Sequence, residues 1–149
     1  MTYLLDTNVV SETRRRRPDP AVLRWLDGVD DEKLYLSVVV VGEIRTGIER
    51  IRVRDPARST DLEQWLLSLV GGFDERVLPV DLAVAEAWGR LRADASLPVA
   101  DSLLTATALV HGLAVVTRDT RTAERCGVPY VDPWGGLSRE LDPVESERR

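Results

Sequence analysis

Four acidic side chains, set far apart along the chain, carry the main chemical interest of this sequence. They stand at or near the ends of predicted helices and strands: Asp6, Glu43, Asp101 and Asp119. An ionised carboxylate at the end of a buried strand costs free energy unless a hydrogen bond, an opposite charge or a metal ion compensates it. Oxygen ligands gathered from distant parts of a chain are how proteins hold hard divalent cations. Because the chain has one histidine and one cysteine, the ligands would be mostly oxygen, which favours Mg²⁺ or Mn²⁺ over Zn²⁺.

Each acid also has an ordinary interpretation when it is taken alone. An acid after a strand is more often a turn or helix cap than a ligand, Asp101 fits a helix cap, and Glu43 fits a solvated helix face. The four together are more specific, because clustered carboxylates repel and raise one another's pKa unless a cation neutralises them. Asp6 and Asp119 are predicted to share one sheet edge, and Asp101 lies where a helix N-terminus offsets its charge. We therefore predict that the four acids form one site.

Short apolar runs that alternate with helical patterns must position these acids. We predict strands over 3–5, 34–36, 77–78, 114–116 and 129–131. Helical spacing predicts helices over 21–26 and 62–69, one that Asp81 caps, and one that Asp101 opens and Gly112 closes. Residues 38–41 are ambiguous, because four valines favour a strand while Ser37 fits an N-cap and later apolar residues recur with helical period. We predict a helix from Ser37, which places Glu43 roughly two turns along it.

This order of elements predicts an α/β fold, a three-layer sandwich in which helices flank a short, mostly parallel sheet. In such folds ligands bind beyond the carboxyl ends of the strands, where both Asp6 and Asp119 are expected. We predict one domain over residues 1–134 and a charged, mobile C-terminal tail over residues 135–149.

Composition limits the class of protein further. The 149 residues are 44% hydrophobic and 30% charged, as in ordinary globular domains, and the apolar runs are too short to cross a membrane. With no signal sequence and a single cysteine, Cys126, we expect a reducing, cytoplasmic location. The net charge of −5 argues mildly against nucleic acid, but the arginines cluster, with a run over Arg14–Arg17. Lysine is nearly absent and no glycine-rich nucleotide motif occurs, which disfavours lysine-dependent mechanisms and the common nucleotide sites.

Short motifs surround each of the four acids. They are Asp6-Thr7-Asn8, Val41-Gly42-Glu43-Ile44-Arg45-Thr46-Gly47, Ala100-Asp101 and Thr117-Arg118-Asp119. Together they resemble the motifs of the PIN-domain ribonucleases, in order and with suitable spacing from about residue 2 to residue 134. The opening segment over 6–12 and the late Val131-Asp132-Pro133-Trp134 look most like the FitB-like branch of the VapC-type toxins, which belong to bacterial toxin–antitoxin pairs.

The resemblance implies a PIN-like fold and a metal-dependent endoribonuclease. Its catalytic acids would be Asp6, Glu43, Asp101 and Asp119. Mg²⁺ or Mn²⁺ would be held by Asp6 and Asp101 with help from Asp119, and would lower the pKa of a water that attacks an RNA phosphodiester. Glu43 would orient this water or hold a second ion.

Other polar residues take supporting roles in the same interpretation. Thr117 would be the hydroxyl beside the acids, and Asn8 a supporting polar group. Arginines near the rim, such as Arg14–Arg17 or Arg45, would hold the RNA backbone.

The resemblance also implies protein partners. These are a small antitoxin with a DNA-binding domain, whose arginine would neutralise the open acids, and a second copy of the chain in a homodimer or dimer of dimers. Trp25 and Leu26 on an early helix are candidates for a surface that receives a partner helix, although core packing is the commoner role of such a tryptophan.

Two other functions stay open on the sequence. The chain would instead be the binding subunit of a DNA-bound repressor complex, with a latent nuclease site. A phosphohydrolase with Asp6 as nucleophile is less favoured, since that chemistry commonly uses a lysine and a second acid two residues on, where this chain has Asn8.

Overall fold

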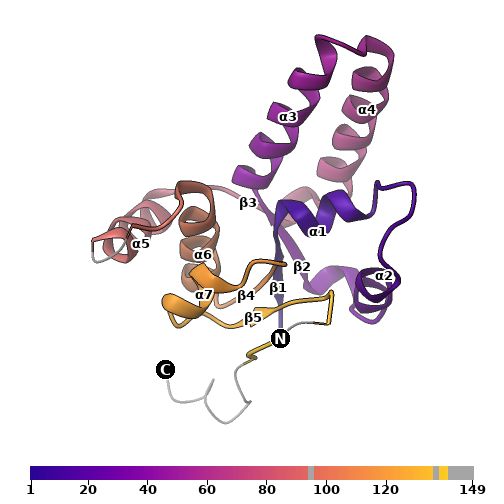
Figure 1. Ribbon diagram of the computed structural model, residues 1–149. Coiled ribbons are helices and arrows are strands. Elements are labelled where there is room, and N and C mark those ends of the chain that lie inside the picture. The colour runs from indigo at the N-terminus through magenta and orange to yellow at the C-terminus, as the bar shows by residue number, and fades with distance from the viewer. Residues whose placement is uncertain (94–95, 136–137, 141–149) are drawn as a thin grey trace.

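A five-stranded, parallel sheet forms the centre of the molecule (Figure 1). The computed structural model describes residues 1–93, 96–135 and 138–140. The strands are β1 (Tyr3–Leu5), β2 (Leu34–Ser37), β3 (Val77–Leu78), β4 (Ala114–Val116) and β5 (Tyr130–Val131). They lie in the order β3-β2-β1-β4-β5, and all four neighbouring pairs are parallel. The predicted strands and the predicted α/β class are confirmed.

Helices cover both faces of this sheet (Figure 1). They are α1 (Thr7–Glu12), α2 (Pro20–Asp27), α3 (Val38–Arg52), α4 (Pro56–Phe73), α5 (Leu82–Arg92), α6 (Val99–His111) and α7 (Arg121–Arg125), with short 3₁₀ turns η1 (Asp31–Lys33) and η2 (Asp74–Arg76). The chain runs from β1 outward to β3, then returns across the sheet to β4 and β5. Because parallel crossovers are right-handed, α1 to α4 lie on one face and α5 to α7 on the other.

The reversal of direction falls between β1 and β4, which are hydrogen-bonded neighbours. In open parallel sheets this is where the connections leave on opposite faces and open a crevice at the carboxyl ends of the strands. Asp6 follows β1 directly and Thr117 follows β4 directly. The topology alone therefore places these two residues at the position where such folds bind ligands.

Local capping decides several helix boundaries. The Ser37 side chain accepts a hydrogen bond from the Val39 N–H at 3.0 Å, so the four valines begin a helix, as predicted. Asp81 caps α5 in the same way, and Gly112 ends α6 with a left-handed φ of 66°. The prediction that Asp101 opens α6 is wrong by two residues. Pro98 occupies the N-cap position, so Asp101 lies inside the first turn.

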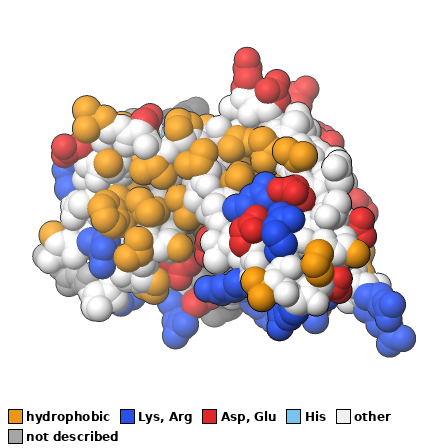
Figure 2. Space-filling model, turned by 90° about the horizontal axis from the view of Figure 1, so that it is seen from above, with side chains coloured by type: hydrophobic (Ala, Val, Ile, Leu, Met, Phe, Trp, Pro, Cys, Tyr) orange, Lys and Arg blue, Asp and Glu red, His pale blue; other side chains and the backbone are white. Residues whose placement is uncertain are grey.

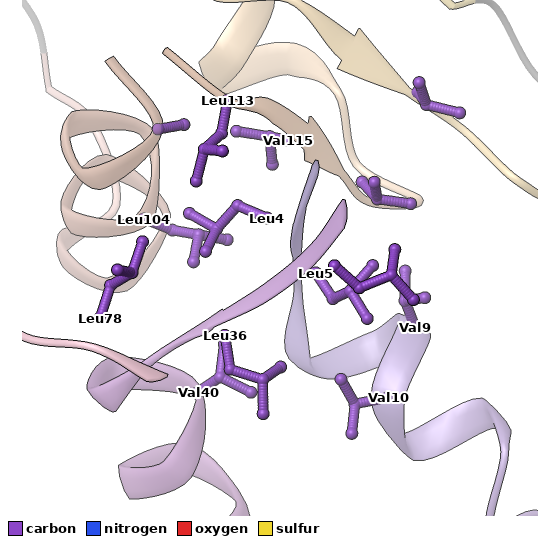
Figure 3. Packing of buried hydrophobic residues seen from close by; sticks show 14 of the residues in the cluster. Leu4, Leu5, Val9, Val10, Leu36, Val40, Leu78, Leu104, Leu113 and Val115 are labelled. Atoms are coloured by element: carbon purple, nitrogen blue, oxygen red, sulfur yellow. The ribbon is translucent and has the colours of Figure 1, made fainter. Parts of the chain in front are cut away.

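The core fills both sides of the sheet (Figure 3). Leu4 points toward Leu104 of α6, whereas its neighbour Leu5 points toward Val9 of α1. All four are buried, as expected for a parallel sheet that helices cover on both faces. The strand β1 is thus held from both sides, and the residue at its carboxyl end has a fixed position. No helix among the described residues is long and apolar enough to cross a membrane.

The predicted C-terminal tail is described only at Gly135 and over 138–140, and its other residues lie outside the described part of the chain. Arg139 pairs antiparallel with Tyr130 through two backbone hydrogen bonds of 2.8 Å. This short stretch lies along the outer edge of β5. The domain boundary at residue 134 and the mobility of the tail stay predictions.

Candidate active site

Asp6 is held in place by three hydrogen bonds at the end of β1. Its N–H donates to the Val116 carbonyl of β4 at 2.9 Å. Its carboxylate accepts from the Thr7 N–H through Oδ1 and from the Thr117 hydroxyl through Oδ2, both at 2.7 Å. Thr117 is therefore the hydroxyl beside Asp6, and Asp6 serves both as the N-cap of α1 and as the central acid of the edge.

Burial and charge act on the Asp6 carboxyl in opposite directions. Loss of hydration raises the pKa of Asp6 most strongly, while the hydrogen bonds from Thr117 and Thr7 lower it and the negative charge of Asp119 raises it further. The net direction is upward. The ionised Asp6 carboxylate therefore lowers the free energy of unfolding at neutral pH.

Asp101 reaches the same edge from the first turn of α6, with its side chain partly exposed. Burial raises the pKa of Asp101, and the charges of Asp6, Asp119 and Glu43 raise it in that order. Carboxylates influence one another in this way only when they are close together. The four predicted acids thus lie within one electrostatic neighbourhood.

Glu43 stands at the rim on α3 and is exposed. Its Oε1 accepts a hydrogen bond from the Thr7 hydroxyl at 2.9 Å, which ties α3 to the start of α1. Thr7 therefore links two of the acids, because its N–H contacts Asp6 and its hydroxyl contacts Glu43.

Asp119 has an internal partner that sequence reasoning missed. Arg121 at the start of α7 donates two hydrogen bonds to the Asp119 carboxylate, from Nε to Oδ1 at 2.8 Å and from Nη2 to Oδ2 at 2.7 Å. This guanidinium lowers the pKa of Asp119, in contrast to Asp6 and Asp101. The two-residue spacing of an acid and an arginine after a strand was the available signal.

The side chains of the four acids do not form a closed ligand shell around a single metal-ion position. Among the described residues, no three His, Cys, Asp or Glu side chains are near enough to one another to hold a single ion. Asp119 faces Arg121, and Glu43 faces Thr7. The donor chemistry nevertheless suits a hard divalent cation, because Asp6 and Asp101 supply carboxylate oxygens at a place of excess negative charge.

The predicted rim arginines separate into two groups. Arg14–Arg17 and Arg58 line one open hollow of about 730 Å³ beyond the C-terminal end of α1. Arg45 instead pairs with Glu49 at 3.5 Å and with Glu63, across the α3–α4 hairpin. The structure thus makes the arginine run, rather than Arg45, the open basic surface.

Asn8 and the two candidates for a partner surface lie partly inside the fold. The Asn8 Oδ1 atom is buried and lacks a hydrogen-bond partner among the described residues. Trp25 packs edge-to-face on Tyr3 at 5.0 Å and lies against the core, which favours the structural role. Leu26 lines a pocket of about 250 Å³ between α1, α2 and α4. Of the two candidates, Leu26 is the one that lines a pocket.

The surface seen from above the carboxyl edge of the sheet differs in side-chain type between its two sides (Figure 2). Hydrophobic side chains gather on the left, in the direction of α5 and α6. Acidic and basic side chains interleave on the right, in the direction of the α3–α4 hairpin.

A short parallel sheet with acidic side chains about its switch point defines a class of protein. The model of the PIN domain family matches residues 3–128. The chain belongs to the PIN-domain family.

Individual relatives narrow this class. The chain is 39% identical over 138 residues to the plasmid stability protein StbB of Pseudomonas syringae pv. tomato, which covers 88% of this chain and 97% of that protein. It is 38% identical to the VapC ribonuclease Y4jK of Sinorhizobium fredii, over 88% of this chain and 96% of the relative. It is 37% identical to the toxin FitB of Neisseria gonorrhoeae, over 88% and 97%.

Solved structures agree with the sequence relatives. The crystal structure of FitAcB from Neisseria gonorrhoeae superposes with a TM-score of 0.85 and 34% identity, over 91% of this chain and 100% of that one. FitAB bound to an IR36 DNA fragment gives a TM-score of 0.84 and 32% identity, over 94% and 100%. The PIN-like sandwich is therefore confirmed.

Proposed function

We propose that this chain is a divalent-metal-dependent endoribonuclease and the toxin of a toxin–antitoxin pair. The observation that carries the proposal is the acidic carboxyl edge of the sheet: Asp6 ends β1 at the switch point, and burial together with neighbouring carboxylates raises the pKa of Asp6 and Asp101. The relatives named as a VapC ribonuclease and as toxin FitB support the reaction and the biological role.

Asp6 and Asp101 would hold Mg²⁺ or Mn²⁺, with Asp119 as a third ligand once it leaves Arg121. When bound, such an ion lowers the pKa of a water molecule and offsets negative charge on the phosphoryl oxygens. Thr117 keeps the Asp6 carboxylate in one orientation, because its hydroxyl donates to Oδ2. Thr7 does the same for Glu43, which would orient the attacking water or hold a second ion from the rim.

The RNA backbone would follow the basic hollow of Arg14–Arg17 and Arg58. This surface begins one short helix away from Asp6, since α1 has six residues and so spans about 9 Å. A phosphodiester at the acids and phosphates in the hollow can therefore belong to one strand. Arginine suits this role because its guanidinium binds phosphate oxygens in pairs.

An antitoxin is the proposed partner. The structural relatives FitAcB and FitAB are complexes by their names, and the second is bound to DNA. A cationic side chain of the partner would neutralise Asp6 and Asp101, whose pKa values are raised by burial and then by neighbouring carboxylates. The pocket that Leu26 lines is the proposed seat of a partner helix. A homodimer or dimer of dimers is proposed for the chain in this complex.

One observation favours the second candidate, a binding subunit of a DNA-bound repressor complex with a latent nuclease site. Arg121 already occupies Asp119, so the acids are not arranged as a ligand shell among the described residues. In that case the purified chain, free of any partner, would not cut RNA.

Cleavage of single-stranded RNA by the purified chain with Mg²⁺ tests the proposal. We expect Asp6→Asn to lower the cleavage rate by at least about 100-fold, more than the loss of an outer-shell partner costs. Glu63→Gln is the matched control, because Glu63 is an acid that ion pairs already compensate. Equal cutting by Asp6→Asn and the unmodified chain would overturn the assignment, and no cutting by either would favour the repressor subunit.

A further inference from the structure

Arg118 lies on the ring of Trp134 at the β5 side of the acidic edge. The Arg118 Cζ atom is 5.2 Å from the centre of the ring. The Thr117 N–H donates to the Val131 carbonyl at 3.0 Å, so the segments that follow β4 and β5 begin side by side. Arg118 stands between Thr117, which contacts Asp6, and Asp119. The pair therefore borders the candidate active site directly.

The two halves of the pair differ in exposure. Trp134 is half-buried against the core, and its backbone N–H donates to the Asp132 carboxylate at 2.9 Å, which fixes the turn after β5. Arg118 is exposed, and no carboxylate among the described residues forms an ion pair with it. The ring is thus a fixed support, and the guanidinium is the outer layer over it.

Other arginine–aromatic contacts among the described residues have different surroundings. Arg76 on Phe73 also donates to backbone carbonyls of Asp31 and Leu34, which is a structural role. Arg14 on Trp65 belongs to the basic hollow. Arg92 on Trp88 lies where α5 packs on α6, and the Trp88 indole N–H donates to the Ser102 hydroxyl at 3.0 Å. Among these contacts, Arg118 is the arginine that directly follows Thr117 and precedes Asp119.

We propose that Arg118, supported by Trp134, is the platform on which a nucleobase of the RNA stacks next to the scissile phosphate. The inference rests on the proposed ribonuclease function and adds a base-binding position to it. Proteins that bind single-stranded RNA stack unpaired bases on aromatic rings and guanidinium planes, and this stacking tolerates different bases because each has a π-face. The bases of a duplex are already stacked. The platform therefore selects unpaired RNA and adds affinity at one nucleotide.

Abasic scanning of a short single-stranded RNA tests this position. Binding is measured by fluorescence anisotropy in an Asp6→Asn background, which prevents cutting. With Arg118 present, we expect one abasic position to weaken binding by about 5- to 150-fold, the range of a lost base stack. We expect Arg118→Ala to bind the intact RNA more weakly by the same factor. In this variant, removing the base at that position should weaken binding no more than removing a neighbouring base.

Further variants separate stacking from charge and from folding. Arg118→Lys keeps the positive charge but lacks the guanidinium plane. We therefore expect RNA binding by Arg118→Lys to depend on salt as in the unmodified chain, but its abasic profile to match that of Arg118→Ala. Arg125→Ala, an exposed arginine of α7, is the matched control and is expected to leave the abasic profile unchanged. Trp134→Phe keeps an aromatic support and is expected to keep a reduced peak in the profile, with thermal unfolding measured alongside.

The outcomes distinguish this inference from the proposed function. If the unmodified chain cuts RNA in an Asp6-dependent way while Arg118 and Arg118→Ala give the same abasic profile, only the platform is overturned. If Arg118→Lys keeps the abasic peak, charge rather than stacking holds the RNA, and the platform is again overturned. If the unmodified chain cuts no RNA at all, the proposed function fails whatever the profile shows.

Discussion

The α3–α4 hairpin and the carboxyl edge of the sheet both gather acidic side chains, but they treat them in opposite ways. In the hairpin, Glu49 and Glu63 lie among Arg45 and Arg52, and these arginines lower the pKa of both glutamates. At the edge, burial and neighbouring carboxylates raise the pKa of two aspartates. Acids that carry their own counter-charge stabilise a surface, whereas acids that lack one mark a place where an external cation is needed.

Asp119 lies between these two cases. It belongs to the acidic edge by position, yet Arg121 compensates it as the hairpin arginines compensate their glutamates. The acids at the carboxyl edge of the sheet therefore differ in compensation. Asp119 pairs with Arg121, whereas Asp6 and Asp101 form no ion pair among the described residues.

The largest expected effect is the loss of an uncompensated acid. We predict that Asp101→Asn lowers RNA cleavage with Mg²⁺ by at least about 100-fold, because it removes a proposed ligand rather than an outer partner. In the hairpin, Glu63→Gln should leave the cleavage rate unchanged and shift the Tm by about 2 °C or less, since exposed ion pairs contribute little. A similar loss of activity in both variants would remove the distinction between the two regions.

A smaller effect is expected from the hydroxyl that orients Asp6. Thr117→Val keeps the volume of the buried side chain but removes its hydrogen bond to Oδ2. We predict a loss of about 10- to 100-fold in cleavage or in Mg²⁺ affinity, the usual cost of an outer-shell partner of a ligand. Thr117→Ser restores the hydroxyl and should recover most of the activity. Full activity in Thr117→Val would show that Asp6 needs no orientation by Thr117.

The smallest effect on the site is expected at the compensated acid. Arg121→Gln removes the counter-charge of Asp119, so the edge becomes more negative and Mg²⁺ binds more tightly. An exposed pair of this kind is worth little, and we predict a gain in affinity of about two- to fivefold by calorimetry. Arg90→Gln on α5, whose arginine pairs with Glu86 away from the acids, is the control. Weaker binding in Arg121→Gln would mean that Arg121 assists the ion rather than competing with it.

Much of this arrangement was predictable from the sequence because it depends on local signals. Asp6 follows a short apolar strand, and Ser37 fits an N-cap, so β1, the start of α3 and the shared edge were each predicted. Asp101 was placed at the start of its helix rather than inside the first turn, because Pro98 takes the cap.

The side-chain pairings were not predictable in the same way. Arg45 was expected to hold RNA but pairs with Glu63 of another helix, and only the packing of α3 against α4 brings the two together. Arg118 meets Trp134 because β4 and β5 are neighbours in the sheet, which their spacing along the chain does not specify.

The contrast between the regions also fixes how stability depends on pH. Asp6 and Asp101 have a raised pKa in the folded chain. Their contribution to the free energy of unfolding is therefore complete below pH 3.8, the ordinary aspartate pKa, and is lost as the pH rises through the pKa of the folded state. For Glu49 and Glu63 the lowered pKa gives a contribution that is present above 4.5 and is lost as pH falls. Without Mg²⁺, Asp6→Asn should therefore gain stability relative to the unmodified chain as pH rises from acid to neutral.

The most direct test of the central claim is to measure the carboxyl pKa values by NMR titration, first without and then with Mg²⁺. We predict that without the ion Asp6 and Asp101 titrate above 3.8, while Glu49 and Glu63 titrate below 4.5. With Mg²⁺, the pKa values of the two aspartates should fall and those of the two glutamates should stay the same. Aspartates that titrate at the ordinary value, or that Mg²⁺ leaves unmoved, would contradict the account of this edge as a cation-dependent active site.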